Sequence, residues 1–297
     1  MRVLLAGASG LLGRHVRHEL VREGHDVRPL VRGISLEPDA VYADLRDPAS
    51  LRGICDGVDA VISCAGAAMQ LGNWGNRVSF DEVDHHGNAN LLAEARRAGV
   101  ARFVYVSVAC ARELMHTEYT RAHGRFVAAL ATSGLACTVV RPTGFYGFLL
   151  ELLRMAWKNR GIIVGDGRAQ TNPIYEGDVA RACVEALASR QAELAIGGPE
   201  IYTRKKIVQL AFEALDRPPR IRYLQPALLR IPLALTRIVN PRIHALFEFG
   251  LAVAQTDVIA PKYGTCRLEQ YFQEVIELTA RARQRRPVFR PLPTSIR

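Results

Sequence analysis

The chain opens with MRVLLAGASGLLG, residues 1–13, and this stretch decides the fold. Residues 2–6 form a short apolar run that ends at a glycine, and the apolar positions after it recur at helical spacing. The stretch therefore predicts a strand, a tight turn and a helix. Gly7, Gly10 and Gly13 fall in the turn. A dinucleotide pyrophosphate needs such a turn, because backbone amides at a helix N-terminus must approach it with no Cβ in the way.

The glycine spacing is G-x-x-G-x-x-G, which differs from the commonest dinucleotide-binding fingerprint, G-x-G-x-x-G. Glycines also close ordinary strand–helix turns, but further strand–helix units follow this one along the chain. The spacing resembles the short-chain dehydrogenase/reductase superfamily, particularly its extended and atypical members. We expect the cofactor to contact the following residues of the turn: Gly7, Ser9, Gly10, Leu11, Leu12 and Gly13.

Composition argues against several other classes of protein. The 297 residues are 49% hydrophobic and 23% charged, as in an ordinary soluble globular protein. The six cysteines include no C-x-x-C pair, so neither a disulfide framework nor a zinc site is indicated. His15 with His18, and His85 beside His86, lack carboxylate or cysteine partners in the sequence, and we expect no metal site. The N-terminal strand leaves no room for a signal peptide, which predicts a cytoplasmic protein.

The net charge of +10 raises the question of an anionic partner. The excess consists mostly of arginines dispersed over the chain, with one cluster at residues 281–286. No nucleic-acid-binding motif accompanies them, and aromatic residues are not interleaved with the basic ones as stacking platforms require. We therefore expect a solvated basic surface and no nucleic-acid partner.

Strand and helix patterns alternate over the first two hundred residues. This order predicts an α/β fold, a doubly wound parallel sheet of the Rossmann type whose ligand lies at the carboxyl edge of the strands. The expected strands are residues 3–6, 26–31, 40–43, 60–64, 102–107, 136–141 and 194–197, and the expected helices are residues 11–23, 48–55, 80–98, 118–133 and 176–189.

The pattern loosens after residue 148 and changes character after residue 199. Helical stretches are expected at residues 203–215, capped by Thr203, and at 227–239, 243–256 and 268–283. We expect three parts in the chain. They are a Rossmann domain at 1–147 and 171–198, a small, mostly helical C-terminal lobe at 148–170 and 199–286, and an extended tail at 287–297.

The longest apolar stretch of this lobe is PALLRIPLALTRIV, residues 226–239. Arg230, Pro232 and Arg237 interrupt it, and it falls short of the eighteen or more apolar residues of a membrane span. We expect a helix that covers a substrate cleft or lies at a dimer contact. A peripheral membrane contact through residues 226–256 is the alternative, because leucines and isoleucines with interspersed arginines also fit an interfacial helix. The oligomeric state is left open.

The residue after the second strand indicates which cofactor binds. Sites that prefer NAD place an Asp or Glu there for the ribose hydroxyl, whereas the 2′-phosphate of NADP attracts a guanidinium group. Arg32 occupies this place, with Arg28 nearby and no acidic neighbour. We therefore expect NADP(H) to be preferred over NAD(H).

Small and acidic residues follow the third, fourth and sixth strands. Asp44 can accept a hydrogen bond from the adenine amino group while Leu45 packs on the ring, and the short side chains of Cys64, Ala65 and Gly66 leave room for the cofactor. The resemblance to the superfamily implies the same roles for these positions. It also implies that Pro142 and Thr143, within RPTGFYG, lie beside the nicotinamide.

Longer segments make the resemblance more specific. VDHHGNANLLAEARRAGVARFVYVSV is similar to the superfamily's helix and strand before the active site, and NPIYEGDVARACVEAL to the segment that returns to the sheet. IGGPEIYTRKKIVQLAFEAL and DVIAPKYGTCRLEQYF resemble an atypical NAD(P)H-binding branch. That branch is similar to divinyl chlorophyllide vinyl reductases and to the nucleotide-binding accessory subunit of respiratory complex I. The resemblance covers residues 1 to about 275.

The resemblance implies a catalytic Tyr-x-x-x-Lys pair on one helix, with a Ser or Thr from the preceding strand end. Tyr119 stands in the tyrosine position, but His123 replaces the lysine, and Ser107 supplies the hydroxyl. A cation about 4 Å from the tyrosine is worth roughly 4 kcal/mol at an effective dielectric constant of 20, or about three pKa units. A neutral histidine forfeits most of that effect. Tyr119 is thus either a poorly activated general acid or a packing residue, and Ser107 either a catalytic hydroxyl or a strand-end cap.

These observations predict an NADP(H)-dependent oxidoreductase that reduces an apolar small molecule by hydride transfer. A carbon–carbon double bond or a quinone-like acceptor needs less from a proton relay. A regulator or assembly factor that binds NAD(P)H without turnover is the alternative. A sugar-nucleotide-type epimerase is a third hypothesis, which requires a better activated tyrosine.

Overall fold

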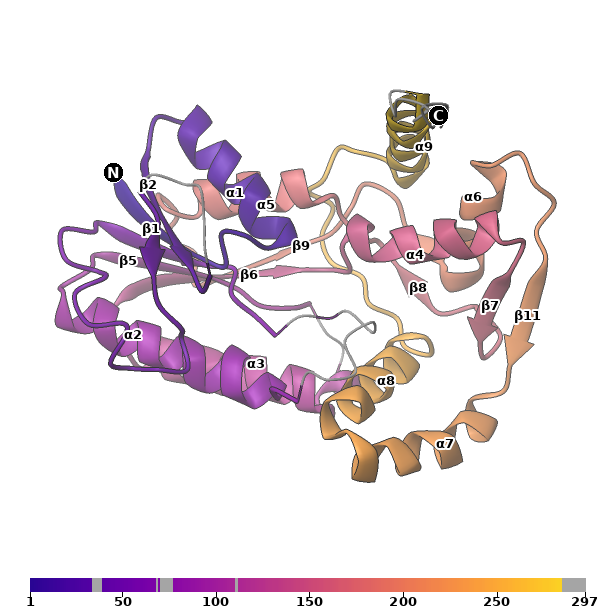
Figure 1. The fold of residues 1–297 in the computed structure, drawn as a ribbon, viewed down its shortest axis with the longest axis horizontal. Coiled ribbons are helices and arrows are strands. Elements are labelled where there is room, and N and C mark those ends of the chain that lie inside the picture. Colours follow the sequence, from indigo (N-terminus) through magenta and orange to yellow (C-terminus); the bar gives the residue numbers. More distant parts are fainter. Residues whose placement is uncertain (34–38, 68, 70–76, 110–111, 285–297) are drawn as a thin grey trace, which may run out of the picture.

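The computed structural model describes residues 1–33, 39–67, 69, 77–109 and 112–284. Seven parallel strands form one sheet in the order β3-β2-β1-β4-β5-β6-β9, with helices on both faces (Figure 1). The predicted doubly wound α/β fold is confirmed. The strands of this sheet are β1 (Arg2–Ala6), β2 (Asp26–Val31), β3 (Val41–Tyr42), β4 (Ala60–Ser63), β5 (Arg102–Val106), β6 (Ala136–Pro142) and β9 (Glu193–Ile196).

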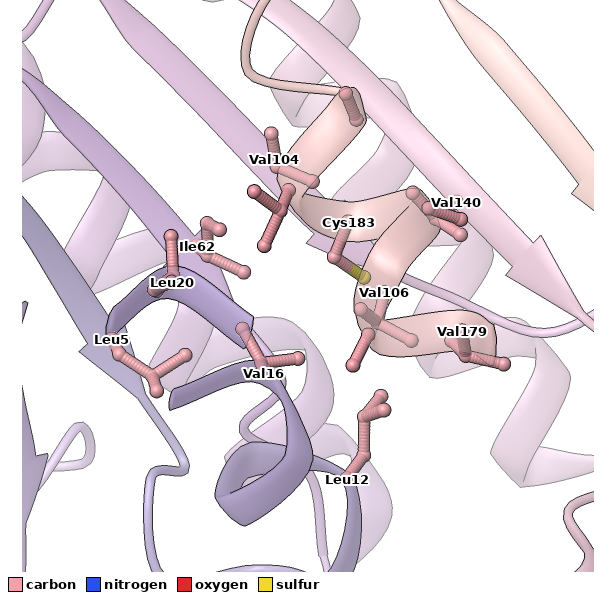
Figure 2. Close-up of a cluster of buried hydrophobic side chains, with 14 of the residues drawn as sticks. Leu5, Leu12, Val16, Leu20, Ile62, Val104, Val106, Val140, Val179 and Cys183 are labelled. Carbon is pink, nitrogen blue, oxygen red and sulfur yellow. The ribbon is translucent and has the colours of Figure 1, made fainter. Parts of the chain in front are cut away.

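Two helical layers bury the faces of the sheet. Helices α1 (Leu11–Arg22) and α5 (Glu176–Glu185) cover one face. The π-helical segment η1 (Asp81–Gly87), α2 (Asn88–Arg97) and α3 (Glu118–Ala131) cover the other. Strands buried on both sides explain the unbroken apolar runs in the sequence. In Figure 2 the first layer shows Leu5, Ile62, Val104, Val106 and Val140 of the strands facing Leu12, Val16 and Leu20 of α1 and Val179 and Cys183 of α5.

The helix expected at residues 48–55 is wrong, because the structure has successive turns there. Local side-chain bonds compete with helix formation: the Ala49 amide donates to the Asp47 carboxylate at 3.0 Å, and the Ser50 hydroxyl donates to the Asp47 carbonyl at 2.8 Å. Gly53 then adopts φ +80°, outside the right-handed helical region.

The order of the strands reverses between β1 and β4, and ligands of doubly wound sheets bind outside the carboxyl ends of the strands at such a point. Ala6 pairs with Ser63 in the parallel register, so the residues that follow both strands meet at one edge. A Cβ atom on Gly7 would lie 2.7 Å from the Cys64 carbonyl oxygen. The tertiary structure thus brings the glycine turn and the segment 64–66 together.

The C-terminal lobe has a core of its own. Helices α4 (Tyr146–Trp157), α6 (Arg204–Glu213) and α9 (Leu268–Gln284) pack around it. Thr203 caps α6 as expected, because its hydroxyl accepts from the Lys206 amide at 3.0 Å. Two small sheets, β8 with β10 and β7 with β11, were not anticipated. The tail at 287–297 lies outside the described residues, and the domain boundaries stay predictions. The remaining elements are η2 (Arg112–Leu114), β7 (Gly161–Val164), β8 (Gln170–Thr171), β10 (Tyr202–Thr203), β11 (Ile221–Leu224), α7 (Pro226–Val239) and α8 (Pro241–Val253).

Helices α7 and α8 form a hairpin that reaches back to the Rossmann domain (Figure 1). Asn240 joins them, and its side-chain oxygen accepts from the amides of Arg242 and Ile243 at the start of α8. A small apolar cluster that includes Phe80, Ala122 and Leu246 holds α8 against α3. None of the helices in the described ranges is long and apolar enough to cross a membrane.

Candidate functional site

The glycine turn has the geometry that a pyrophosphate requires. Gly7 adopts φ +76°, and a Cβ atom on Gly13 would lie 2.0 Å from the Gly7 carbonyl oxygen, so α1 packs directly on the turn. Gly10 caps α1 without a side-chain bond, and the first turn of this helix carries no acidic residue. Its first amides and the positive end of its dipole are thus left for an anion. The chain's own residues therefore fit a dinucleotide at this position.

The turn's other predicted contacts differ in exposure. Ser9 is exposed and its carbonyl oxygen accepts from Arg14 at 2.9 Å. Leu11 is half-buried, whereas Leu12 is buried in the core between the sheet and helices α1 and α5. The last two residues can therefore offer a ligand chiefly their backbone amides.

Arg32 lies directly after β2 and is exposed. Asp44, after β3, is held by Arg46, whose guanidinium lies 2.6 Å from the carboxylate. The hydrogen bond from Arg46 lowers the pKa of Asp44 most, and the charge of Arg32 lowers it further. Arg46 therefore pairs with this carboxylate, and Arg32 adds a second positive charge in its neighbourhood. Arg28 is not part of this group, because its guanidinium donates to the carbonyl oxygens of Ile54 and Asp56.

The residues predicted to flank the adenine and its ribose lie along the carboxyl edge. Leu45 is buried in the core, where its Cβ lies 3.0 Å from the position that a Cβ on Gly87 would take. Cys64 and Ala65 are half-buried, and Gly66 is exposed. A Cβ on Gly66 would lie 2.7 Å from the Asp84 carboxylate, so a larger residue there would require the Asp84 side chain to shift.

Pro142 ends β6, and Thr143 follows it as a buried residue. The Thr143 hydroxyl donates to the Asn172 carbonyl oxygen at 2.5 Å, and its amide donates to the Ile196 carbonyl oxygen at 3.1 Å. The hydroxyl is therefore engaged in holding this strand end to the segment that follows β8. A contact of Thr143 with the nicotinamide stays a prediction.

His123 is buried on α3 and meets protein groups at both ring nitrogens. Its Nδ1 lies 2.6 Å from the hydroxyl of Tyr105 on β5, and its Nε2 lies 3.4 Å from Oδ1 of Asp84 in η1. The longer of these distances leaves Nε2 without a well-formed hydrogen bond among the described residues. The ring stands in the lysine position of the superfamily but is turned into the protein.

Burial shifts the pKa values of this group in opposite directions. It lowers the pKa of His123 to about 3, and the positive charge of Arg141 contributes. It raises the pKa of the Asp84 carboxyl to about 7, opposed by the hydrogen bond from the Ala67 amide and by the charge of Arg242. His123 is therefore uncharged at neutral pH and offers Tyr119 no cation.

Ser107 and Tyr119 lie one step closer to the carboxyl edge. Ser107 follows Tyr105 by two residues, on the same face of β5, and Tyr119 precedes His123 by one helical turn. Helix α3 runs back from the end of β5 to the start of β6, so it is antiparallel to the strands. Two residues along β5 and one turn back along α3 therefore both lead about 6 Å toward the carboxyl edge. The Ser107 hydroxyl is buried and has no hydrogen-bond partner within the part of the chain that the structure describes. Such a group fits a ligand at this edge.

Aromatic rings surround Tyr119. Its ring lies 5.1 Å from that of Phe80, 4.6 Å from that of His123 and 4.6 Å from that of Phe249, between centroids. Phe249 belongs to α8, so the C-terminal lobe contributes to the surroundings of the candidate catalytic tyrosine. The site is apolar on this side.

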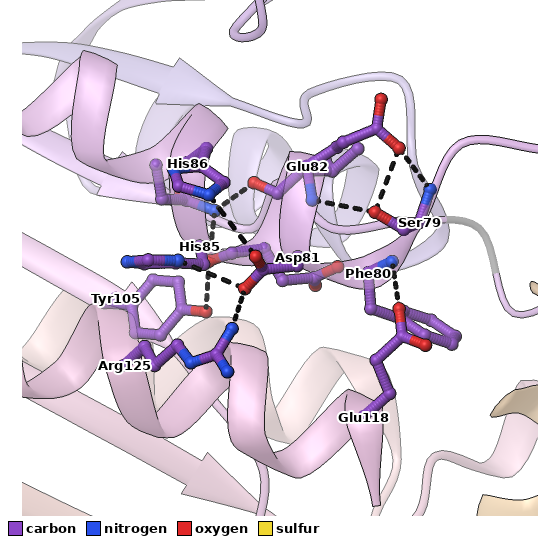
Figure 3. Close-up of polar contacts among 12 residues, drawn as sticks. Ser79, Phe80, Asp81, Glu82, His85, His86, Tyr105, Glu118 and Arg125 are labelled. Atoms are coloured by element: carbon purple, nitrogen blue, oxygen red, sulfur yellow. Dashed lines mark hydrogen bonds and ion pairs between the residues drawn. The ribbon is translucent and has the colours of Figure 1, made fainter.

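A second polar group lies between η1 and α3 (Figure 3). Asp81 lies 3.1 Å from Nδ1 of His85 and 3.3 Å from Nε2 of His86, so the expectation that these histidines lack a carboxylate partner is wrong. Arg125 of α3 also pairs with Asp81 at 2.7 Å. Its positive charge beside the carboxylate disfavours a metal ion between Asp81, His85 and His86, whose ligand atoms lie within 4.8 Å of one another. We assign the two histidine contacts to η1 itself and the Arg125 contact to the packing of η1 on α3.

Sequence reasoning missed Asp84, Tyr105 and Arg242. Arg242 of α8 is buried with its guanidinium 5.4 Å above the Phe80 ring. The signal for Asp84 was its place in the helical pattern of residues 80–98, where Phe80, Asp84 and Leu91 share the buried face. A carboxylate on a core-facing position indicates a site or a partner.

Fold and site together define a Rossmann-type NAD(P)H-binding protein. Residues 7–190 match the NAD(P)H-binding family, and the chain belongs to it.

Individual relatives agree with the resemblance seen in the sequence, which is confirmed. The chain is 29% identical over 321 residues to divinyl chlorophyllide a 8-vinyl-reductase of Oryza sativa subsp. indica, covering 92% of this chain and 78% of the relative. It is 25% identical over 236 residues to NADH dehydrogenase (ubiquinone) 1 alpha subcomplex subunit 9 of Arabidopsis thaliana. This match covers 72% of this chain and 58% of the relative. UDP-glucose 4-epimerase of Thermotoga maritima has the same fold, with a TM-score of 0.72 at 18% identity over 95% of this chain and 99% of that one.

Proposed function

We propose that this chain binds NADP(H) in preference to NAD(H). Arg32 is exposed at the end of β2, and Arg46 neutralises Asp44, the acidic residue that follows β3. A 2′-phosphate gains charge-assisted hydrogen bonds from guanidinium groups, whereas the ribose hydroxyl of NAD carries no charge with which Arg32 could pair. Membership of the NAD(P)H-binding family does not distinguish NADP(H) from NAD(H). The arrangement of Arg32, Asp44 and Arg46 supports NADP(H).

We further propose that the protein is a reductase of an apolar small molecule. The observation that carries this proposal is the buried hydroxyl of Ser107, which is unpaired among the described residues and lies at the carboxyl end of β5, on the face that α3 covers with Tyr119. Bound NADPH would supply a hydride there. Ser107 would hold a polar atom of the substrate, and the Tyr119 hydroxyl or solvent would supply the proton. Phe80 and Phe249 make the surroundings of Tyr119 suitable for an apolar substrate.

The neutral His123 restricts the kind of acceptor. Without a nearby cation the Tyr119 hydroxyl remains a weak acid, so it stabilises a developing alkoxide poorly. A carbon–carbon double bond or a quinone-like acceptor spreads the charge within the substrate itself. We therefore propose such an acceptor rather than an isolated ketone or a sugar.

A non-catalytic role is the second candidate. The buried, uncharged His123 supports it, because a protein that only binds NAD(P)H has no need of an activated tyrosine. One relative carries the name of a subunit of NADH dehydrogenase. In that case the nucleotide would regulate the protein or its assembly with a partner. For either role the cytoplasmic location remains a prediction. The names of the two relatives describe them as chloroplastic and mitochondrial.

A binding titration tests the cofactor proposal. Purified protein is titrated with NADPH and with NADH while nucleotide fluorescence is followed. We expect tighter binding of NADPH and loss of this preference in Arg32→Asp. Arg190→Asp is the matched control, because Arg190 is an exposed arginine before β9, at the amino edge of the sheet.

Three outcomes are informative. Equal affinity of the parent protein for both nucleotides contradicts the preference for NADP(H). A preference retained in Arg32→Asp contradicts the role of Arg32. Tight NADPH binding with no oxidation in the presence of enones and quinones contradicts the reductase proposal and supports the non-catalytic role.

A further inference from the structure

Helix α7 carries apolar residues on two opposite faces, and α8 covers one of them. Leu229, Leu233 and Thr236 are half-buried on the covered face. Nδ1 of His244 in α8 lies 2.9 Å from the Leu233 carbonyl oxygen, and the two helices contact each other. This contact fixes which side of α7 faces the protein.

The opposite face is an exposed apolar stripe. Leu228, Ile231, Leu235 and Ile238 have exposed fractions of 70%, 74%, 60% and 84%. Their spacing of three, four and three residues places them on one side of the helix. We call these four residues the outer stripe. Val239, 67% exposed, extends its C-terminal end. Single exposed apolar residues are common, but a continuous stripe marks an interaction site.

The charged residues of α7 and of the segment that leads into it are all positive. Residues 217–247 contain six arginines and no aspartate or glutamate. Among them Arg220, Arg222 and Arg237 are exposed, on the segment that leads into α7 and on α7 itself. An apolar stripe with arginines and no carboxylates complements a surface that is apolar below and anionic above.

We propose that α7 docks this protein on an anionic lipid bilayer, with the outer stripe in the boundary between headgroups and acyl chains. Fourteen helical residues span about 21 Å, so α7 lies in the plane of the interface and does not cross the membrane. The helix is the outermost element along the lower edge of Figure 1, beyond α8. It can therefore reach a flat surface without rearranging the sheet.

A second copy of the chain fits this surface less well. In a two-fold contact the same patch meets itself, so the arginines of one copy would face those of the other. Like charges that face one another are unfavourable. An anionic bilayer places negative headgroups at that position instead.

The same hairpin connects the docking surface with the candidate active site. Phe249 of α8 contacts Tyr119, while α7 packs on the other side of α8. A docked protein would hold Tyr119 near the bilayer, where apolar small molecules partition. Membrane docking does not depend on the proposed reductase function, and its test needs no substrate.

Co-sedimentation with vesicles tests the proposal. The intact protein is mixed with vesicles of phosphatidylcholine alone or of phosphatidylcholine with phosphatidylglycerol. We expect binding to the anionic vesicles, and less of it as salt concentration rises. Leu235→Glu should weaken binding by more than about tenfold, because a large apolar side chain leaves the interface. Arg237→Gln should weaken it about fivefold, the effect of one charge near an anionic surface.

Leu278→Glu is the matched control for the outer stripe. Leu278 is 64% exposed on α9, outside the α7–α8 hairpin, so this variant should bind vesicles as the parent does. Equal binding of the parent to neutral and anionic vesicles would overturn the charge argument. Undiminished binding of Leu235→Glu would overturn the role of α7. A concentration-dependent dimer without vesicles, abolished in Leu235→Glu, would show that the outer stripe is an interface between protein copies.

Discussion

Nε2 of His123 lies 3.4 Å from the carboxylate of Asp84, and both groups are buried between α3 and η1. Folding moves a proton between them. In the unfolded chain near pH 5 the carboxyl is ionised and the imidazole is protonated. Burial raises the pKa of Asp84 to about 7 and lowers that of His123 to about 3, so the folded pair carries its proton on the carboxyl. The number of bound protons is unchanged, and the two effects on stability cancel over this range of pH.

Single substitutions should uncover the two opposing effects. In Asp84→Asn the remaining His123 binds fewer protons when folded than when unfolded. The free energy of unfolding should therefore rise with pH between about 3 and 6.5, by up to about 1.4 kcal/mol per pH unit. In His123→Gln the remaining Asp84 binds more protons when folded, so the free energy of unfolding should fall between about pH 4 and 7.

Denaturant unfolding at several pH values between about 4 and 7 measures both slopes. The parent protein is the reference and should show the shallowest dependence of the three. Slopes of the same sign in the two variants would contradict the proposed exchange of one proton.

Tyr119→Phe should decide whether the tyrosine or solvent supplies the proton in the proposed reduction. If the tyrosine supplies the proton, NADPH oxidation linked to a quinone or enone should fall by about a hundredfold or more, with NADPH binding unchanged. Tyr223→Phe is the control, since Tyr223 is exposed on β11. Unchanged turnover in Tyr119→Phe would show that solvent delivers the proton and that the tyrosine is a packing residue.

Ser107→Ala should lower activity without lowering stability. The Ser107 hydroxyl is buried and unpaired within the described residues, so its removal should leave the free energy of unfolding unchanged or raise it by up to about 1 kcal/mol. Thr143→Val is the comparison, because its hydroxyl donates to the Asn172 carbonyl oxygen, and it should cost about 1–2 kcal/mol. Chemical denaturation and NADPH oxidation are measured on both. A destabilised Ser107→Ala with full turnover would mean that the hydroxyl is structural.

Gly13→Ala should damage the cofactor turn. Its Cβ would lie 2.0 Å from the Gly7 carbonyl oxygen, so α1 must move away from the turn, at a cost of about 1–3 kcal/mol and with weaker NADPH binding. Gly250→Ala is the matched control on α8, where a Cβ meets nothing within 4 Å. That variant should be more stable by about 0.5–1 kcal/mol, because alanine favours a helix over glycine. Thermal unfolding and nucleotide titration compare the two, and normal binding in Gly13→Ala would contradict the close packing.

The order of the elements could be read from local patterns because each one buries a face of its own. Apolar runs at β1, β4 and β5 and the helical spacing in α1 follow from the period of a strand or helix. The turns at residues 48–55 could not be predicted in this way, and a helix was expected there instead. There the side chains of Asp47 and Ser50 bond to nearby backbone groups, and such bonds compete with a helical pattern of similar composition.

The sequence by itself determined the fold class, the glycine turn and the absence of lysine at position 123, since each depends on residue type and spacing along the chain. Only the tertiary structure decided that His123 is buried against Tyr105 and Asp84, that Ser107 has an unpaired hydroxyl, and that one face of α7 is uncovered. These properties depend on which segments, distant in sequence, meet in space. The burial of a side chain depends on which segments pack against it, and burial in turn decides its charge state and its hydrogen bonds.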